Sequence, residues 1–347
     1  MNRILIPLAL GFRLGVTIRA AAYRRGWLKT RRLTRPVISV GNLTTGGTGK
    51  TPLVAYLAET LLKQGWKPAI LTRGYGRRSG SDLLCIAPGP ERTANPREVG
   101  DEPALLARQF PQVPIVVCAD RYRAGREAED RFNLDVHILD DGFQHLALAR
   151  DLDIVTLDTT QELSDWALLP AGPLREPLSA LERAHVVVLT RARLGDAWTL
   201  EGEIRRRNSQ AMLIPSVTEL CGMLNLVTSE RYAAEAWRGK KVFAFAGIGN
   251  PRAFFANLET WGLSLAGQAV FRDHHVYGPR EISRLCTRGL AAGAEALVTT
   301  QKDTMNFPAP WKADIPVLAC VTRIKLRDEE SFEDVLFSRL QATRVKT

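Results

Sequence analysis

Residues 39–62 read SVGNLTTGGTGKTPLVAYLAETLL, and this stretch decides the fold. A β-rich run ends at Gly41 and Asn42, a glycine-rich loop follows, and apolar residues then recur at helical spacing. Strand, glycine loop and helix in this order form the context of a phosphate-binding loop, whose usual pattern is G-x-x-x-x-G-K-[ST]. Residues 44–51 fit that pattern except at the first position, where Thr44 stands in place of glycine.

The chemistry of this loop predicts an ATP site. Its glycines let the backbone curl so that N–H groups point at phosphate oxygens, and the start of the following helix adds positive potential. We expect Lys50 to reach the outer phosphates and the Thr51 hydroxyl to ligate Mg²⁺. A glycine-rich turn without a ligand is the alternative. The predicted nucleotide-binding residues are Thr44, Thr45, Gly46, Gly47, Thr48, Gly49, Lys50 and Thr51.

A second apolar strand ends in two carboxylates. The stretch LDVHILDDGFQH, residues 134–145, places Asp140 and Asp141 directly after that strand. A carboxylate in this position helps to hold Mg²⁺ in phosphoryl-transfer enzymes. Two adjacent carboxylates are costly to bury unless a cation or hydrogen-bond donors satisfy them. We therefore predict Thr51, Asp140 and Asp141 as metal ligands. Plain Asp-Asp-Gly turn chemistry is the alternative, and the sequence leaves open which aspartate touches the metal.

Strand and helix patterns alternate along the chain, and most strands are continuous apolar runs. Such strands are typical of a parallel sheet that helices cover on both faces. We predict an α/β protein with a P-loop NTPase-like, mostly parallel sheet and a smaller α/β C-terminal domain. The 347 residues suffice for two domains. The expected parts are an N-terminal helix (1–30), a P-loop domain (31–215), a linker region (216–239) and a C-terminal domain (240–347).

Positive charge is concentrated near the N-terminus. The chain has 47 Lys and Arg against 37 Asp and Glu, a formal net charge of +10, and no acidic residue precedes Glu59. A basic excess with this asymmetry favours an anionic partner, such as nucleic acid, phospholipid headgroups or a phosphorylated substrate.

The first 30 residues predict an amphipathic helix that associates with a membrane surface. Arg13 and Arg19 interrupt the apolar run, and a spanning helix needs ~20 apolar residues. Basic residues follow where a signal peptide would have its cleavage site. A helix of this composition can lie among the headgroups of an anionic leaflet. A terminal helix packed on the protein's own core is the alternative. The apolar stripe comprises Leu5, Leu8, Ala9, Phe12, Val16, Tyr23 and Trp27.

Polar residues after two further strands could bind an anionic substrate. The stretch LTRGYGRR, residues 71–78, carries Arg73 and Tyr75, and Arg121 follows a later strand. Arginine suits this role because its guanidinium group can hold oxyanions through paired hydrogen bonds. Solvated loops explain the same spacing almost as well.

Two more segments carry groups that could transfer protons. Asp101 and Glu102 stand where a helix begins, a position at which carboxylates are also common for structural reasons. The stretch FRDHHVYG, residues 271–278, contains the adjacent histidines His274 and His275. A histidine beside a carboxylate can orient or tune an acid–base group. Spacing alone does not choose between the two histidines.

Eight stretches together resemble one known family. They are SVGNLTTGGTGKTP, LTRGYGR, GDEP, ADRYRAG, LDDGFQH, LLPAGPLREP, FRDHHVYG and TQKD, and they follow in this order over nearly the whole chain. The ordered set closely resembles the tetraacyldisaccharide 4′-kinases of lipid A biosynthesis. The resemblance implies a kinase that transfers the γ-phosphate of ATP, with Mg²⁺, to the 4′-hydroxyl of a tetraacyldisaccharide 1-phosphate. It also implies a peripheral enzyme on the cytoplasmic face of the inner membrane.

The resemblance assigns roles to individual residues. It implies that Asp101 is the base that accepts the proton of the sugar hydroxyl, that His274 supports it, and that Lys50 contributes to catalysis. Arg73, Tyr75 and Arg121 are the expected substrate contacts.

The implied partners are an acylated disaccharide phosphate lipid and the anionic inner-membrane surface, with neither nucleic acid nor an obligate protein partner. The rival interpretation is a nucleotide-dependent regulatory or metal-insertion accessory protein with the same loop. A lysine in place of Thr45, or a metal-binding His/Cys cluster, would favour that rival.

Overall fold

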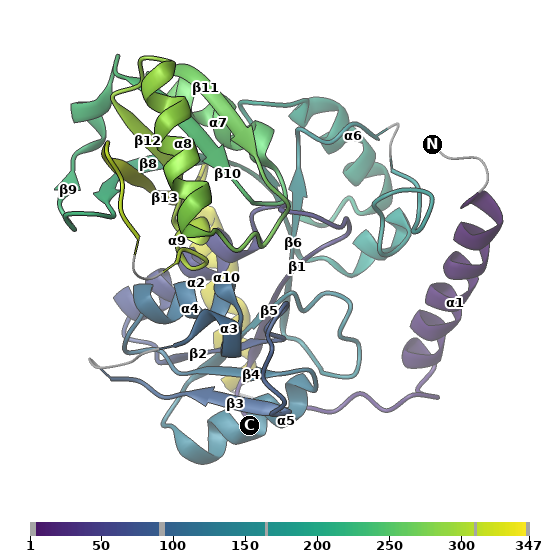
Figure 1. The fold of residues 1–347 in the computed structure, drawn as a ribbon. Coiled ribbons are helices and arrows are strands. Elements are labelled where there is room, and N and C mark those ends of the chain that lie inside the picture. The colour runs from purple at the N-terminus through teal and green to yellow at the C-terminus, as the bar shows by residue number, and fades with distance from the viewer. Residues whose placement is uncertain (1–4, 90–93, 164–165, 309–310, 345–347) are drawn as a thin grey trace.

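The computed structural model describes residues 5–89, 94–163, 166–308 and 311–344. Within them the strands form one 13-stranded sheet whose order is β11-β10-β12-β13-β8-β7-β6-β1-β5-β2-β4-β3, with β9 beside β8 (Figure 1). The strands are β1 (Val37–Asn42), β2 (Pro68–Thr72), β3 (Leu83–Ile86), β4 (Ile115–Cys118), β5 (Val136–Asp140), β6 (Leu152–Asp158), β7 (Val186–Thr190), β8 (Met212–Asn225), β9 (Arg231–Tyr232), β10 (Lys241–Ala246), β11 (Ser264–Val270), β12 (Ala296–Thr300) and β13 (Val317–Leu326). The helices are α1 (Ile6–Arg24), α2 (Lys50–Lys63), α3 (Pro96–Val99), α4 (Asp101–Gln109), α5 (Arg121–Arg131), η3 (Leu178–Arg183), α6 (Ala197–Arg207), η4 (Ala234–Trp237), α7 (Pro251–Thr260), α8 (Pro279–Ala291), α9 (Gln301–Thr304) and α10 (Glu329–Arg344).

Parallel pairing brings the predicted site residues to one edge of the sheet. Strand β1 pairs in parallel with both β5 and β6, and Val40 lies opposite Asp140. The carboxyl ends of parallel strands meet at the same edge, so the loop after β1 and the carboxylates after β5 lie side by side. Strand β2, which leads to Arg73, pairs in parallel with β5 as well.

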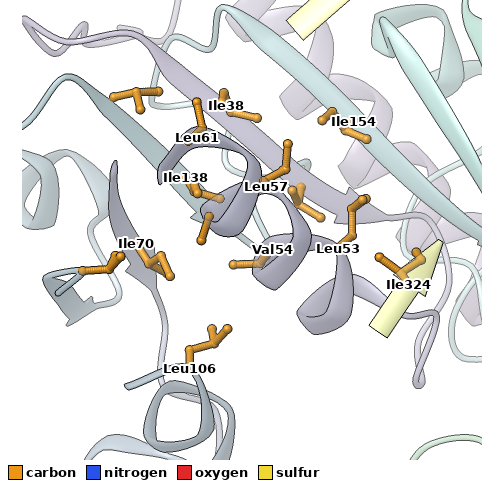
Figure 2. Close-up of a cluster of buried hydrophobic side chains, with 14 of the residues drawn as sticks. Ile38, Leu53, Val54, Leu57, Leu61, Ile70, Leu106, Ile138, Ile154 and Ile324 are labelled. Atoms are coloured by element: carbon orange, nitrogen blue, oxygen red, sulfur yellow. The ribbon is translucent and has the colours of Figure 1, made fainter. Parts of the chain in front are cut away.

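Helices cover both faces of this sheet, as the sequence predicts. The apolar side of α2, with Leu53, Leu57 and Leu61, packs on Ile38 and Ile138 (Figure 2). The next strand residue, Leu139, points to the opposite face and joins a cluster with residues of α5. Alternate strand residues enter different cores because successive side chains of a strand point to opposite faces. The predicted fold class is thus confirmed.

The C-terminal half repeats the arrangement on a smaller scale. Strands β11, β10, β12 and β13 are parallel, and α7 and α8 pack on opposite faces of them. Strand β8 joins the two halves. Its first residues pair in parallel with β7, and residues from Ser216 onward pair antiparallel with β13. The sequence places a linker region at 216–239, whereas residues 216–225 form a continuous part of the sheet.

The last helix returns to the first half of the chain. Phe332, Leu336 and Leu340 of α10 are fully buried in the same core as α2. The ring centroid of Phe332 lies 5.9 Å from that of Tyr56 on α2. Residues 240–347 therefore do not pack as one separate unit, because α10 ties the C-terminal half to the P-loop half.

Helix α1 lies along the side of the molecule, away from the sheet (Figure 1). Ala22 is its buried residue, whereas Leu8, Leu10, Leu14 and Ile18 are more than half exposed. The predicted stripe is partly right: Leu5, Ala9, Phe12, Val16 and Tyr23 are half-buried, but Leu8 and Trp27 face solvent. Among the described residues, no helix has the length and apolarity needed to cross a membrane.

Candidate active site

The phosphate-loop candidate lacks its first glycine because that position does not need one. Thr44 forms an antiparallel bridge with Leu174, and the flanking backbone bonds run from Thr45 N to Pro173 O (2.8 Å) and from Arg175 N to Leu43 O (2.7 Å). The φ angle of Thr44 is not positive, so a residue other than glycine adopts this conformation without strain. The loop therefore starts as an extension of β1 and curls only afterwards.

The curl depends on two glycines, Gly46 and Gly49. Gly46 has φ 102° and Gly49 has φ 86°, both in the left-handed region, and Gly49 immediately precedes α2. Buried hydroxyls fix the segment between them. Thr48 Oγ1 accepts a hydrogen bond from Asn42 (3.0 Å) and lies 2.8 Å from Thr156 Oγ1. The backbone amides at the start of α2 are thus held for an anionic ligand.

The C-terminal half also contacts this loop. A Cβ atom on Gly249, in the turn after β10, would lie 2.3 Å from the backbone nitrogen of Gly47, so that only glycine fits there. Arg191 donates to the carbonyl oxygen of Gly47 (2.8 Å) and pairs with the buried Asp158. Asn250 donates to the same aspartate at 2.9 Å. The turn at Gly249 and Asn250 therefore packs near the phosphate loop from the C-terminal half, and Arg191 braces the loop from within the P-loop half.

The two adjacent aspartates lie in different environments. Asp141, with φ 52°, pairs with Arg175 at 2.7 Å and Lys50 at 3.4 Å. Burial would raise its pKa, but these two cations outweigh burial and lower it. Asp140 accepts one hydrogen bond from Thr72 (3.0 Å), and burial together with the charges of Glu102 and Asp141 raises its pKa to about 7.

The carboxylate of Asp140 suits Mg²⁺. Its Oδ1 atom is buried and has no hydrogen-bond partner within the described residues. A buried oxygen left in this way costs free energy unless an unseen cation or water satisfies it. Mg²⁺ prefers carboxylate, hydroxyl and water oxygens. Asp140 is therefore the better placed of the two aspartates to contact a metal ion.

Asp101 and His274 come together from the two halves of the chain. The Nδ1 atom of His274 lies 2.7 Å from Oδ2 of Asp101, and Asn306 donates to the same oxygen at 3.4 Å. Burial would raise the pKa of Asp101, but the hydrogen bond to His274 and the charge of Lys302 lower it. The same hydrogen bond raises the pKa of His274. His275 instead pairs with Glu281 at 2.9 Å, so the two adjacent histidines have different carboxylate partners.

The three candidate substrate contacts occupy different positions. Arg73 is exposed after β2, and Tyr75 is 72% exposed with its ring centroid 5.4 Å from that of His274. Arg121 is buried beneath the site and donates to the backbone carbonyls of Ala119 (3.0 Å) and Cys118 (3.4 Å). Arg73 and Tyr75 remain candidates for direct contact, whereas Arg121 is placed to support the loops from below.

Comparison with known proteins agrees with this geometry. The profile of the family described as "Tetraacyldisaccharide-1-P 4'-kinase" matches residues 1–341. The chain belongs to this family. Two relatives named tetraacyldisaccharide 4'-kinase are those of Geobacter metallireducens, 41% identical over 96% of each chain, and Geobacter sulfurreducens, 42% identical over 95% of this chain and 91% of the relative.

A solved structure shares the fold of this family member. It is LpxK from Aquifex aeolicus, described as an "apo" form in complex with ATP. Its TM-score is 0.76 at 33% identity, over 97% of this chain and 98% of that one. The resemblance stated from the ordered motifs is thereby confirmed.

Sequence reasoning missed several residues that the fold brings to the site. Arg175 lies in the loop LLPAGPLREP and Lys302 in the stretch TQKD, and Lys302 pairs with Glu102, which the sequence already places beside Asp101. Gln144 accepts a hydrogen bond from Arg175 and donates to the carbonyl of Asn42 at 2.9 Å. Their motifs were visible, but only the three-dimensional pairing shows which side chains in them face the site.

Proposed function

We propose that this protein transfers the γ-phosphoryl group of ATP to the 4′-hydroxyl of a tetraacyldisaccharide 1-phosphate. Family membership supports this activity, and one observation of the site carries it: Asp101 of the P-loop half lies 2.7 Å from the imidazole of His274 of the C-terminal half. The charge of Glu102, next to Asp101, contributes to the raised pKa of Asp140. The proton-accepting pair is therefore within electrostatic reach of the metal-binding carboxylate.

The triphosphate would be held by the amides of residues 44–51 and by the ammonium group of Lys50. Thr51 and Asp140 would hold Mg²⁺, with Asp141 keeping Lys50 and Arg175 in place. When bound, Mg²⁺ supplies neutralisation of the charge that develops on the phosphate oxygens. Fixed cations and amides of this kind act mainly by electrostatic stabilisation, because phosphoryl transfer needs little covalent help.

Asp101 would accept the proton of the sugar hydroxyl. A base must be deprotonated to act, and the lowered pKa of Asp101 keeps its carboxylate ionised at neutral pH. His274 orients that carboxylate through Nδ1 and stabilises its charge. Tyr75 covers the imidazole on one side and leaves most of its ring free for a substrate.

An apolar cavity beside α1 fits the acyl chains of the acceptor. It has a volume of about 430 Å³ and is lined by Ile6, Ala9, Leu10 and Arg13 of α1, by Arg207 and by several residues between Trp166 and Ser179. The same segment contains Arg175, which pairs with Asp141. The exposed residues Leu10, Leu14 and Ile18 recur every four positions and form a second apolar surface of α1. We assign this surface to the anionic cytoplasmic face of the inner membrane, to which the enzyme binds peripherally.

The experiment that tests this function is direct. Purified protein is incubated with labelled ATP, Mg²⁺ and a tetraacyldisaccharide 1-phosphate in mixed micelles, and the lipid products are separated. We expect a bisphosphorylated lipid whose new phosphate is at the 4′ position. ATP hydrolysis without any labelled lipid, in protein that binds ATP normally, would instead support a regulatory nucleotide-binding protein.

A further inference from the structure

Lys302 connects the two halves of the chain beside the Asp101–His274 pair. It lies in the short helix α9, which follows β12. Its Nζ atom is 2.9 Å from Oε1 of Glu102 on α4 and 3.4 Å from Oδ1 of Asp273 in the loop after β11. The Lys302 side chain is 20% exposed, so this is a largely enclosed contact rather than a surface ion pair.

The two partners of Lys302 are the sequence neighbours of the pair itself. Glu102 follows Asp101, and Asp273 precedes His274. Two bridges therefore run side by side between α4 and the loop 271–278: one direct, through Asp101 and His274, and one through Lys302. We propose that Lys302 is a positioning residue that fixes the geometry and the charge state of the Asp101–His274 pair. This inference rests on the role proposed above for that pair.

The turn that carries Lys302 is itself anchored to the loop of His274. The neighbouring Asp303 is buried and accepts hydrogen bonds from Tyr277 Oη and Gly247 N, both at 2.8 Å. Gly247 in turn accepts a hydrogen bond from the backbone of His274 at 3.1 Å. These contacts hold His274 at φ 61°, a backbone conformation that a residue other than glycine does not keep without support. The backbone of Lys302 is thus held in place relative to the loop that carries His274.

The charge of Lys302 acts on both members of the pair. Asp101 is faced by His274, Lys302 and the amide of Asn306, and His274 is faced by Asp101, Asp273 and Lys302. The ammonium group lowers the pKa of Asp101 and opposes the rise in the pKa of His274. It therefore keeps the carboxylate ionised and counteracts full protonation of the imidazole.

The test compares Lys302→Met, Lys302→Arg and a matched control, Lys240→Met. Lys240 forms a half-exposed ion pair with Glu295 at 2.7 Å on the surface of the same half of the chain. We expect Lys302→Met to lower kcat on the order of 10- to 100-fold, with little change in KM for ATP, because the pair is misplaced rather than removed. The acid limb of the kcat/KM profile should move to higher pH. Lys302→Arg should restore most of the rate and the profile, and Lys240→Met should match the wild type.

A second variant keeps the test informative if Met at position 302 prevents folding. Asp273→Asn alters a side chain that is 37% exposed and leaves Lys302 in place, and we expect a several-fold loss of kcat. A wild-type rate and pH profile in the folded variants would refute the positioning role. An equal loss in Lys302→Arg and Lys302→Met, without a shift of the profile, would also overturn it. An active Asp101→Ala enzyme would instead remove the proposed base, whatever Lys302 does.

Discussion

Asp101 and His274 form a 2.7 Å contact although 173 positions separate them in the chain. Asp101 begins α4 in the P-loop half, and His274 lies in a loop of the C-terminal half. The base that we propose is therefore supported by His274 only while the two halves are held together at this edge. Such an arrangement would limit phosphoryl transfer to water, because the carboxylate would lose its imidazole partner whenever the halves separate.

The role of Asp101 can be separated from that of the nucleotide site. We expect Asp101→Ala to lower kcat for lipid phosphorylation roughly 10²- to 10⁴-fold, the usual contribution of a general base. ATP affinity, measured by calorimetry, should stay close to wild type because Asp101 does not belong to the phosphate loop. Asp130→Ala is a suitable control, since that side chain is 62% exposed on α5. Near-normal turnover in Asp101→Ala would exclude it as the base, and lost ATP binding would point to a metal or structural role.

The buried Asp140 carboxylate should reduce the stability of the folded protein at neutral and higher pH when no metal ion is bound. Burial, with the charges of Glu102 and Asp141, raises its pKa from the ordinary 3.8 to about 7. An acid with a raised pKa in the folded state retains its proton there after the unfolded chain has lost it. Its contribution to stability is therefore fully present below about pH 4 and is lost as the pH rises to about 7.

Asp140→Asn should consequently raise the melting temperature at pH 8, without metal, by several degrees. The difference should be smaller at pH 5, where Asp140 is itself protonated. The variant should have lost lipid phosphorylation, and Mg²⁺ with ATP should stabilise it less than the wild type. Thermal unfolding at both pH values, with and without Mg²⁺-ATP, gives the answer. A melting-temperature difference that does not change with pH would contradict a buried carboxylate of raised pKa.

Local patterns were enough to predict the parallel strands of the P-loop half. These strands are buried on both faces, so they read as continuous apolar runs, and the loop at 44–51 has its signature in adjacent residues. The edge strand β3 differs, because it is only partly buried and pairs antiparallel with β4. The sequence places a linker at the second half of β8, because most side chains from 217 to 221 are only partly buried and the antiparallel partner, β13, lies about a hundred positions later. The packing of α10 against the core of α2 is equally non-local, and the spacing of apolar residues within α10 does not show which core they enter.

The candidate site shows the same limit at the level of single residues. The carboxylates Asp140 and Asp141 are adjacent in sequence, and only the fold shows that one faces two cations while the other keeps an unpaired oxygen. Arg175 stands in the proline- and glycine-rich loop LLPAGPLREP, where local pattern assigns it no partner. Its pairing across 34 positions depends on the bridge between Thr44 and Leu174, which no local pattern encodes.

Arg175 offers a sharp test of that pairing. It donates two hydrogen bonds to Asp141 Oδ1 and Oδ2, at 3.0 and 2.9 Å from one nitrogen, and a third at 2.7 Å from the other. We expect Arg175→Ala to lower kcat on the order of 10²- to 10³-fold, the range for loss of one fixed electrostatic group. Arg175→Lys should rescue little, because an ammonium group cannot reproduce the planar fork. Arg126→Ala, on the exposed side of α5, is the control. Full activity in Arg175→Lys would show that charge alone matters there.

The exposed face of α1 can be tested without disturbing the core. Leu14 is 62% exposed and Ile18 is 57% exposed, one helical turn apart. Burying each side chain in a bilayer interface is worth roughly 1.5–3 kcal/mol, so the double variant Leu14→Glu/Ile18→Glu should bind anionic vesicles on the order of 100-fold less tightly. Its melting temperature should not change, because neither side chain packs in the core. Turnover of a short-chain, water-soluble acceptor should also persist, since the catalytic groups lie elsewhere.

A control substitution, Leu290→Glu, places one carboxylate at a 50% exposed leucine on α8 and should leave vesicle binding intact. Co-sedimentation with vesicles of anionic and of neutral lipid separates the apolar contribution from the attraction of the basic N-terminal segment for negative headgroups. The double variant should lose binding to both kinds of vesicle, whereas added salt should weaken only the binding to anionic vesicles. Undiminished binding of the double variant would assign membrane attachment to another surface and leave the exposed leucines of α1 without that role.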